Sequence, residues 1–224
     1  MLSPLFAACI LCYTVKNEVM SMGYLFTILA GYFLGCSNMA LYLSRRKNTD
    51  LRSGGSGNLG ASNAVVLLGW KAGVLTAVHD IGKAVLAVLL AEWLFPQLTY
   101  ADAAAGTACV LGHIFPFYLK FRGGKGFASY FGMTLALNWK VALIVGIAVV
   151  LVTIVTDYIV CGTLTTVLTV PVYLGIQHSS WLLALILSIG TVVILYKHRE
   201  NYPRMLNGTE LGLRSAIKGK NKAK

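Results

Sequence analysis

A glycine-rich segment in the first third of the chain carries residues suited to binding an anion. Residues 55–63 read Gly-Ser-Gly-Asn-Leu-Gly-Ala-Ser-Asn. Closely spaced glycines let the backbone turn tightly and approach a ligand, and consecutive N–H groups form a nest for an anion. No Lys-Ser or Lys-Thr follows, so this is not an ATP-type phosphate loop. The candidate substrate-binding residues are Ser56, Gly57, Asn58 and Asn63. The alternative is a flexible loop without a ligand.

A second segment combines glycines with cations. Residues 113–126 read His-Ile-Phe-Pro-Phe-Tyr-Leu-Lys-Phe-Arg-Gly-Gly-Lys-Gly. Arginine binds a phosphate as a two-pronged donor, and lysine binds it as a point charge. A helix is expected to begin directly afterwards, and its positive N-terminal end would face the same anion. The candidates are Arg122, Gly123, Gly124, Lys125 and Gly126. The alternative is a basic loop with a turn.

A third segment, residues 197–210, brings a histidine together with polar side chains near the C-terminus. His198 and Asn201 are three residues apart, so they would share one face of a helix. Arg204 and Glu210 would pair with each other or reach a ligand. The alternative is a helix end followed by a solvated basic tail.

Ionisable residues also lie inside apolar stretches. Asp80 and Lys83 are three residues apart, the spacing of an ion pair on one helix. Charges within a membrane are costly, and they are usually paired or functional. An ion pair that holds the helices together and a catalytic role both stay open. His79 is expected to be structural, whereas His113 would either hydrogen-bond another helix or touch the site.

The composition around these segments is that of a membrane protein. Of the 224 residues, 57% are hydrophobic and 12% are charged, whereas about a quarter of a soluble domain is charged. The net charge of +11 comes from basic residues clustered between apolar runs, which favours loops beside anionic lipid over nucleic-acid binding. The five cysteines fall in apolar stretches, so we expect neither a metal site nor a disulfide framework.

Seven apolar runs predict an all-α integral membrane protein with about seven transmembrane helices. The expected helices are 22–43, 73–96, 101–118, 127–138, 140–156, 159–178 and 181–197. The charged residues Lys16 and Glu18 interrupt a further apolar stretch that is too short to span alone. We divide the chain into an N-terminal extension of uncertain status (1–19), a membrane domain (20–213) and a basic tail (214–224).

The distribution of charge predicts the orientation of the helices. Alternating them places most basic residues on one side, in residues 44–72, 119–126, 157–158 and 198–224. Only Lys16 and Lys140 fall on the other side. The positive-inside rule makes the basic side cytoplasmic. Tryptophans prefer membrane interfaces, and the opposite interface would hold Trp93, Trp139 and Trp181.

The three polar segments, in this order between membrane helices, resemble the motifs of the bacterial acyl-phosphate:glycerol-3-phosphate acyltransferase family (PlsY). The resemblance rests on GSGNLGASN, GHIFPFYLKFRGGKG and HRENYPRMLNGTE, and it covers roughly residues 24–212. Asp80 and Lys83 match a D-x-x-K pattern in the family's second helix. The resemblance implies a seven-helix enzyme of the bacterial inner membrane, with its active site and C-terminus in the cytoplasm.

The resemblance also implies an activity: transfer of a fatty acyl group from acyl phosphate to the hydroxyl of glycerol 3-phosphate. The product would be lysophosphatidic acid, an early intermediate of phospholipid synthesis. Neither coenzyme A, a metal nor another cofactor is implied, and an enzyme that produces acyl phosphate is a candidate partner. The implied catalytic residues are Lys125, His198 and Asn201, and Glu210 joins the substrate-binding residues. We expect residues 122–126 with Ser56 to hold acyl phosphate, and His198 and Asn201 to position glycerol 3-phosphate. The general base is either His198 or a phosphate oxygen of a substrate.

The sequence departs from the family pattern at three places. The first motif of the family usually ends in Arg ten residues after the Ser, and here that place is Val66. The family's loop after the fifth helix usually reads T-R-Y-V-S, and here Asp157 and Val160 replace the Arg and the Ser. These changes keep two alternatives open, a diverged paralogue with another acceptor and a non-catalytic binding protein. A transporter of an anionic metabolite is a third alternative, although such proteins usually show repeats or broken helices at mid-membrane.

Overall fold

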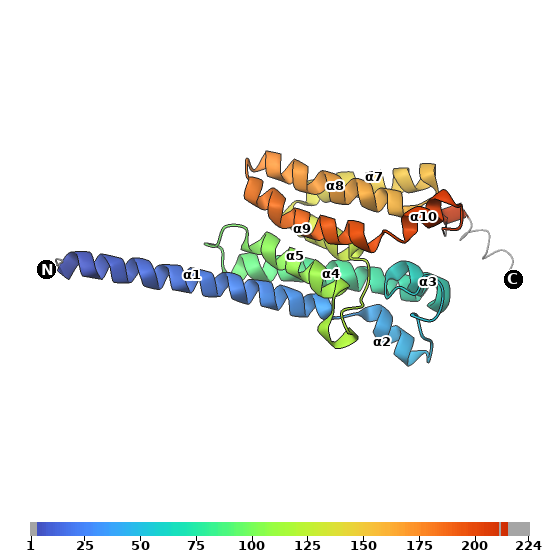
Figure 1. Cartoon of the computed structure of the whole chain (residues 1–224), viewed down its shortest axis with the longest axis horizontal. Coiled ribbons are helices and arrows are strands. Elements are labelled where there is room, and N and C mark those ends of the chain that lie inside the picture. The colour runs from blue at the N-terminus through green and yellow to red at the C-terminus, as the bar shows by residue number, and fades with distance from the viewer. Residues whose placement is uncertain (1–3, 211, 215–224) are drawn as a thin grey trace.

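The computed structural model describes residues 4–210 and 212–214, and every regular element in these ranges is a helix (Figure 1). The helices are α1 (Pro4–Cys36), α2 (Met39–Arg46), α3 (Ala61–Leu68), α4 (Trp70–Leu94), α5 (Ala101–Ile114), η1 (Phe117–Leu119), α6 (Phe127–Leu137), α7 (Trp139–Thr156), α8 (Ile159–Gln177), α9 (Trp181–Lys197) and α10 (Asn201–Leu206). The predicted all-α class is therefore confirmed. The predicted basic tail lies outside the described residues, apart from Arg214.

Several helices are suited to cross a membrane. Four stretches are long and apolar enough: Val19–Arg46, Trp70–Leu94, Trp139–Thr156 and Ile159–Gln177. Phe127–Leu137 and Trp181–Lys197 are shorter apolar helices. Large apolar side chains of α7, such as Ile147 and Leu151, are more than half exposed, as expected of a surface that faces lipid rather than water. The protein is thus a multi-pass membrane protein, and the count of seven spans stays a prediction.

The helix boundaries differ from the prediction where polar residues or proline intervene. The expected helix 22–43 is divided, because the side chain of Asn38 accepts a hydrogen bond from the N–H of Leu41 (2.8 Å) and caps a new helix. The expected helix 101–118 ends at Ile114, since Pro116 disfavours helical backbone in the residue before it. The status of residues 1–19 stays open, although the structure makes the part of this segment from Pro4 onward helical, as the beginning of α1.

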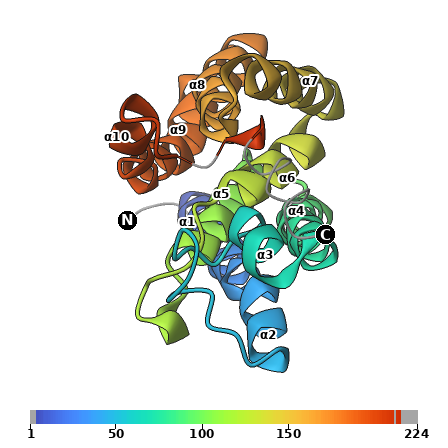
Figure 2. The ribbon, with the colours of Figure 1, turned by 90° about the vertical axis from the view of Figure 1, so that its right-hand side faces the viewer.

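The first half of the bundle packs closely around α5. α1 lies along α5, and glycines at Gly31 and Gly35 allow the two backbones to meet. A Cβ at either position would overlap the carbonyl of Ala105 or Cys109 on α5. Small residues four apart are a common device for close helix contact in membranes. α4 packs against both α5 and α6, so α6 lies between this half and the half formed by α7, α8 and α9 (Figure 2).

The polar segments gather at one end of the bundle, the end that faces the viewer in Figure 2. α2, α3 and α10 all lie there, and α1 extends beyond the bundle at the other end (Figure 1). At that other end, the α4–α5 and α8–α9 connections meet around a cavity lined by Glu92, Tyr100 and His178. Three highly exposed indoles belong to helix ends on this side: Trp93, Trp139 and Trp181.

Candidate active site

A polar cavity of about 360 Å³ opens where the three predicted segments meet. It lies among the loop before α3, the start of α8 and the connection from α9 to α10. Of the predicted site residues, its wall includes Ser56, Asn58, Asn63, Lys125, His198, Asn201 and Glu210. Segments that are far apart in the sequence are therefore brought to one site.

A chain of polar contacts joins the second and third segments. Lys125 Nζ donates to Asn201 Oδ1 at 2.6 Å, and Asn201 Nδ2 donates to Glu210 Oε1 at 2.7 Å. Arg204 Nε forms an ion pair with Glu210 Oε2 at 2.7 Å. Burial lowers the pKa of the Lys125 ammonium, and the nearby Glu210 carboxylate acts in the opposite direction. The contacts hold the ammonium in the cavity wall, where it can bind an anion.

The imidazole of His198 faces the cavity with one ring nitrogen, and its tautomer is fixed by a hydrogen bond of the other nitrogen. It caps α9 and is only 4% exposed. Nδ1 donates to the carbonyl of Ile194 at 2.9 Å, so Nε2 of the neutral ring is an acceptor. Burial lowers the pKa of His198 to about 4, and the ring stays neutral at pH 7. The expected shared helical face does not occur, because Asn201 starts a separate helix, but both residues line the same cavity.

Asn63 shapes the first segment from within. It is the third residue of α3 and is 2% exposed. Its Oδ1 accepts from the N–H of Ser56 at 2.9 Å, and its Nδ2 donates to the carbonyls of Leu51 (2.7 Å) and Asn58 (3.0 Å). The amide therefore closes the loop on itself. Gly57 sits in the turn with φ +66° and does not line the cavity.

The second segment uses its glycine amides differently from the prediction. The N–H of Gly123 donates to Ile114 O at 3.0 Å, and that of Gly124 donates to His113 O at 3.1 Å. These amides anchor the loop on the end of α5, whereas the prediction had them bind an anion. The side chain of Arg122 is exposed and lines neither this cavity nor the apolar one described below. Lys125 is thus the cation of this loop that reaches the site.

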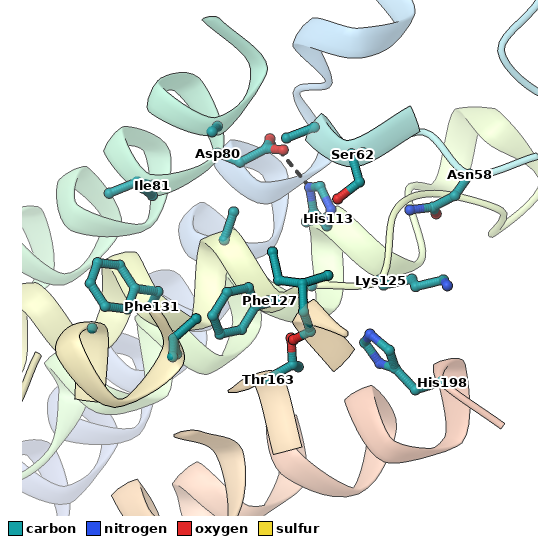
Figure 3. A pocket seen from close by; sticks show the side chains of 18 residues that line it. Asn58, Ser62, Asp80, Ile81, His113, Lys125, Phe127, Phe131, Thr163 and His198 are labelled. Carbon is teal, nitrogen blue, oxygen red and sulfur yellow. Dashed lines mark hydrogen bonds and ion pairs between the residues drawn. The ribbon is translucent and has the colours of Figure 1, made fainter. Parts of the chain in front are cut away.

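A second, largely apolar cavity of about 320 Å³ adjoins the polar one. Figure 3 shows the side chains that line this apolar cavity. Asn58, Lys125 and His198 line both cavities, so the two share a wall. The apolar cavity continues between helices past Gly126, Phe127 and Phe131. Phe131 and Gly146 also border a groove of about 570 Å³ on the outer face of α6 and α7. The apolar cavity and this groove therefore adjoin each other between the polar site and the outer surface of α6 and α7, and together they are called the apolar path.

The predicted ion pair of α4 is confirmed, with Lys83 Nζ 2.8 Å from Asp80 Oδ1. Both residues are buried, and Asp80 borders the apolar cavity. His79 hydrogen-bonds to Ser37 (2.9 Å), as expected of a structural residue. His113 contacts both members of the pair and lines the apolar cavity, so it belongs to this buried cluster and to the site.

The three departures from the family pattern fall into two groups. Val66 and Val160 both line the polar cavity and give it an apolar wall. Asp157 does not line the cavity. Its Oδ1 accepts a hydrogen bond from the backbone N–H of Arg214 at 2.7 Å, and its carbonyl oxygen accepts one from the backbone N–H of Leu213 at 2.8 Å. It ties the C-terminal segment to the turn between α7 and α8. This aspartate therefore adds no negative charge to the cavity wall.

The apolar wall of the site was not identified from the sequence. Phe127, Phe131, Gly146 and Thr163 come from three membrane helices and look like ordinary membrane-helix residues. Gly146 offers a weak signal, since glycine in a membrane helix often marks a close approach or a space. Their roles depend on which face of each helix turns inward.

Comparison with known proteins identifies the family. The family model described as "Glycerol-3-phosphate acyltransferase" matches residues 25–208. The "Glycerol-3-phosphate acyltransferase" of Brucella anthropi is 34% identical over 192 residues, which cover 85% of this chain and 94% of that protein. The "Glycerol-3-phosphate acyltransferase 1" of Oceanobacillus iheyensis is 36% identical over 204 residues, 87% of this chain and 97% of that protein.

Solved structures agree with the sequence relationship. The crystal structure of PlsY, an integral membrane glycerol 3-phosphate acyltransferase, in its glycerol 3-phosphate form has a TM-score of 0.79 and 30% identity, covering 85% of this chain and 95% of that one. Its lysophosphatidic acid form has a TM-score of 0.77 and 29% identity, covering 86% and 96%. The similarity extends over nearly the whole membrane domain and all three polar segments, and the chain belongs to the glycerol-3-phosphate acyltransferase family, of which PlsY is a member.

Proposed function

We propose that this protein transfers a fatty acyl group from acyl phosphate to a hydroxyl of glycerol 3-phosphate and so forms lysophosphatidic acid for phospholipid synthesis. The observation that carries the proposal is a polar cavity with a lysine in its wall, joined to an apolar path that reaches the lipid. PlsY, a relative of similar fold, has been solved in glycerol 3-phosphate and lysophosphatidic acid forms.

The geometry suits acyl transfer from an activated donor. The hydroxyl oxygen of the acceptor bonds to the acyl carbon, the bond from that carbon to the phosphate oxygen breaks, and phosphate leaves with the electron pair. The hydroxyl proton passes to a base. Since acyl phosphate is already activated, the protein has to orient the two substrates and stabilise developing charge. Lys125, held by Asn201 at 2.6 Å, would bind the phosphate that leaves.

Two groups are candidates for the base. His198 presents the lone pair of Nε2 to the cavity, but a pKa of about 4 makes it a weak base at neutral pH. A phosphate dianion, with a second pKa of about 6, binds a proton more strongly. We therefore favour a phosphate oxygen of a substrate as the base for the hydroxyl that reacts. His198 would accept a hydrogen bond from the other hydroxyl of glycerol 3-phosphate and so orient the acceptor.

The apolar path is the proposed route of the acyl chain. Apolar side chains and Gly146 line it from the shared wall out to the groove on α6 and α7. Each buried methylene contributes about 0.8 kcal/mol, so a chain lying there would retain the donor while its phosphate occupies the polar cavity. The lipid bilayer would supply the donor sideways, without its passage through water.

The orientation follows from charge. The end of the bundle that holds the site also carries α2, which ends in Arg45 and Arg46, and the loop before α3, which contains Arg52. Three exposed tryptophans lie at the opposite end: Trp93, Trp139 and Trp181. We propose that the site faces the cytoplasm of a bacterium and that the inner membrane holds the protein. Glycerol 3-phosphate would then reach the site from water.

An altered acceptor is the second candidate. Val66 and Val160 give the polar cavity an apolar wall where the family pattern has a cation and a hydroxyl. An acceptor alcohol with less negative charge or an added apolar group would suit that wall. An acceptor screen with acyl phosphate as donor separates this candidate from the first.

Donor choice is the direct test of the proposal. Purified protein in lipid is given glycerol 3-phosphate with either acyl phosphate or acyl-coenzyme A, and labelled lysophosphatidic acid is measured. We expect product from acyl phosphate and at least about a hundredfold less from acyl-coenzyme A. Product with acyl-coenzyme A at an equal rate would contradict the proposed donor.

A further inference from the structure

Asp157 lies in the turn between α7 and α8, where its backbone has an unusual conformation. Its φ is +72°, in the left-handed region that glycine adopts readily and that aspartate and asparagine tolerate better than most other residues. The mechanism above does not use Asp157, and its side chain does not line the polar cavity. Its hydrogen bonds join the turn to the C-terminal end of the described chain.

The chain after α10 connects the polar cavity to this turn. Residues 207–210 and 212–214 are called the C-terminal strap. Near its beginning, the N–H groups of Thr209 and Glu210 both donate to the carbonyl of Arg204, at 2.8 and 3.0 Å. Thr209 and Glu210 also line the polar cavity. The beginning of the strap is therefore part of the cavity wall.

The far end of the strap is fixed to the turn. Asp157 accepts the N–H of Arg214 at its carboxylate (2.7 Å) and the N–H of Leu213 at its carbonyl oxygen (2.8 Å). The guanidinium of Arg214 donates to the carbonyl of Ile154, in the last turn of α7, at 3.2 Å. Gly212 is buried, and a Cβ at this position would overlap the Asp157 carboxylate. The strap thus approaches the turn closely, and the Asp157 carboxylate is one of its anchors.

Glu210 connects the strap to the lysine of the site. Its carboxylate accepts from Asn201 Nδ2 at 2.7 Å and from Arg204 Nε at 2.7 Å. A carboxylate only accepts hydrogen bonds, and an ammonium only donates them. The Asn201 amide therefore has one orientation that suits both neighbours, with Nδ2 towards Glu210 and Oδ1 towards Lys125, at 2.6 Å. The position of Glu210 thus determines how Asn201 holds Lys125.

We propose that Asp157 is a positioning residue, which anchors the strap and thereby fixes Glu210 in the cavity wall. Glu210 orients Asn201, and Asn201 keeps the Lys125 ammonium directed at the phosphate that leaves. This role rests on the proposed function, because it acts on the same phosphate. The family pattern usually has arginine in place of Asp157. A guanidinium has no acceptor, so it would not hold the N–H of Arg214 in this way.

The charge of Glu210 gives this role a signature in the pH dependence of the reaction. Burial lowers the pKa of Lys125, and among the charged groups Glu210 opposes this most strongly. The groups around the ammonium are Glu210, Arg204, Glu200 and Lys197, with the neutral ring of His198 in the same wall. If the strap detaches, Glu210 moves away and the pKa of Lys125 falls further. The ammonium would then lose its charge at a lower pH, so the alkaline decline of kcat should move to lower pH.

Substitutions at both ends of the strap separate this role from an effect on folding. Asp157→Gly removes the acceptor for Arg214, and glycine adopts the positive φ without strain. Asp157→Asn keeps an accepting oxygen and also tolerates this conformation. Gly212→Ala disturbs the same contact from the strap, because its methyl group would displace the carboxylate. Glu210→Gln removes the charge at the cavity.

The experiment measures kcat against pH and the thermal unfolding midpoint of wild type, these variants and the double variant Asp157→Gly/Glu210→Gln, with acyl phosphate and glycerol 3-phosphate. We expect Asp157→Gly and Gly212→Ala to lower kcat about tenfold or more, since a misplaced group costs rate, and to move the alkaline decline to lower pH. Asp157→Asn should stay within about threefold of wild type, because it keeps the hydrogen bond. The double variant should resemble Glu210→Gln alone, because the anchor acts through Glu210.

Three results would overturn the role of Asp157 and leave the proposed function intact. The first is wild-type kcat of Asp157→Gly at every pH. The second is a double variant in which the losses of the two single variants multiply. The third is a set of kcat values that follows the unfolding midpoint while the pH profile stays unchanged. An inactive wild type would overturn the proposed function and this role with it.

Discussion

At the scale of single residues, the positive charge available to a phosphate is small. Arg204 pairs with Glu210 at 2.7 Å, whereas Lys125 contacts the neutral amide of Asn201. Among the described lining residues, Lys125 is thus the cation without a carboxylate partner. Val66 lines the same cavity and is half exposed, so a cation at this position would reach a bound phosphate.

The substitution Val66→Arg is expected to strengthen binding of glycerol 3-phosphate. A charge-assisted hydrogen bond contributes about 1.5–3 kcal/mol, and each 1.4 kcal/mol is a factor of ten, so KM should fall about tenfold or more with kcat nearly constant. Steady-state kinetics in lipid measure the effect. Val65→Arg is the matched control, because Val65 is exposed on the same helix and does not line the polar cavity. Equal effects of the two variants would show that general charge, not the cavity, is responsible.

Protonation of His198 should make the stability of the folded protein depend on pH. Its pKa is about 4 in the folded protein and 6.5 in the unfolded chain. Between these values the unfolded state binds a proton that the folded state does not, so stability is lost as the pH falls from 6.5 towards 4, by up to about 3 kcal/mol. His198→Asn keeps a donor for Ile194 and cannot titrate. Thermal unfolding of both proteins at pH 7.5 and pH 4.5 should therefore show a smaller pH effect for the variant. Parallel losses would contradict the assignment.

At the scale of elements, the predicted helices were largely correct, because long apolar runs bounded by charge or proline specify them. The predicted C-terminal ends at residues 156 and 197 are the ends of α7 and α9 in the structure. α3 was missed, because its eight residues lie inside a segment whose glycines predict a loop. The residues of the polar site could be predicted, since their types are rare in membrane helices. The roles of Asn63 and of the Gly123 and Gly124 amides could not, because hydrogen-bond partners depend on the folded loop.

Replacing Asn63 or Asn58 by alanine should have different effects, although both residues belong to the same loop region. The side-chain amide of Asn63 holds the loop by hydrogen bonds to backbone groups of Ser56 and Leu51. Asn58 instead lines both cavities. Asn63→Ala should lower the unfolding free energy by about 1–3 kcal/mol and raise KM for both substrates. Asn58→Ala should raise KM with little change in stability. Unfolding curves and kinetics of the two variants give the comparison, and an unchanged unfolding midpoint in Asn63→Ala would refute the loop-closing role.

The close approach of Gly146 and Phe131 along the apolar path should make activity depend on the length of the acyl chain. A Cβ on Gly146 would lie 3.3 Å from the Phe131 ring, and both residues border the cavity and the outer groove. Gly146→Leu should obstruct the path, so that activity with long acyl phosphates falls at least about tenfold more than activity with short ones. Ala148→Leu adds bulk on a different face of the same helix and serves as control. Loss that is independent of chain length would argue against the path.

At the scale of the whole molecule, the two substrates would reach the site by separate routes, one from water and one from the lipid bilayer. The polar segments lie at one end of the bundle (Figure 2) and form a site open to water. The apolar path extends from this site to the outer surface of α6 and α7. The other end carries exposed tryptophans. A water-soluble phosphate ester and a lipid-borne acyl donor can thus meet at the shared wall of the two cavities. We propose that the residues of this shared wall, among them Lys125 and His198, catalyse the acyl transfer.

The most direct test is the stoichiometry of the reaction catalysed by purified protein in lipid. Wild type should release one phosphate from acyl phosphate for each lysophosphatidic acid formed, and only when glycerol 3-phosphate is present. Lys125→Met should lower the rate at least about a hundredfold, since it removes the charge that faces the leaving phosphate. Lys71→Met, which removes an exposed cation beside Trp70, should leave the rate unchanged. Phosphate release without lysophosphatidic acid, or equal rates for wild type and Lys125→Met, would contradict the account.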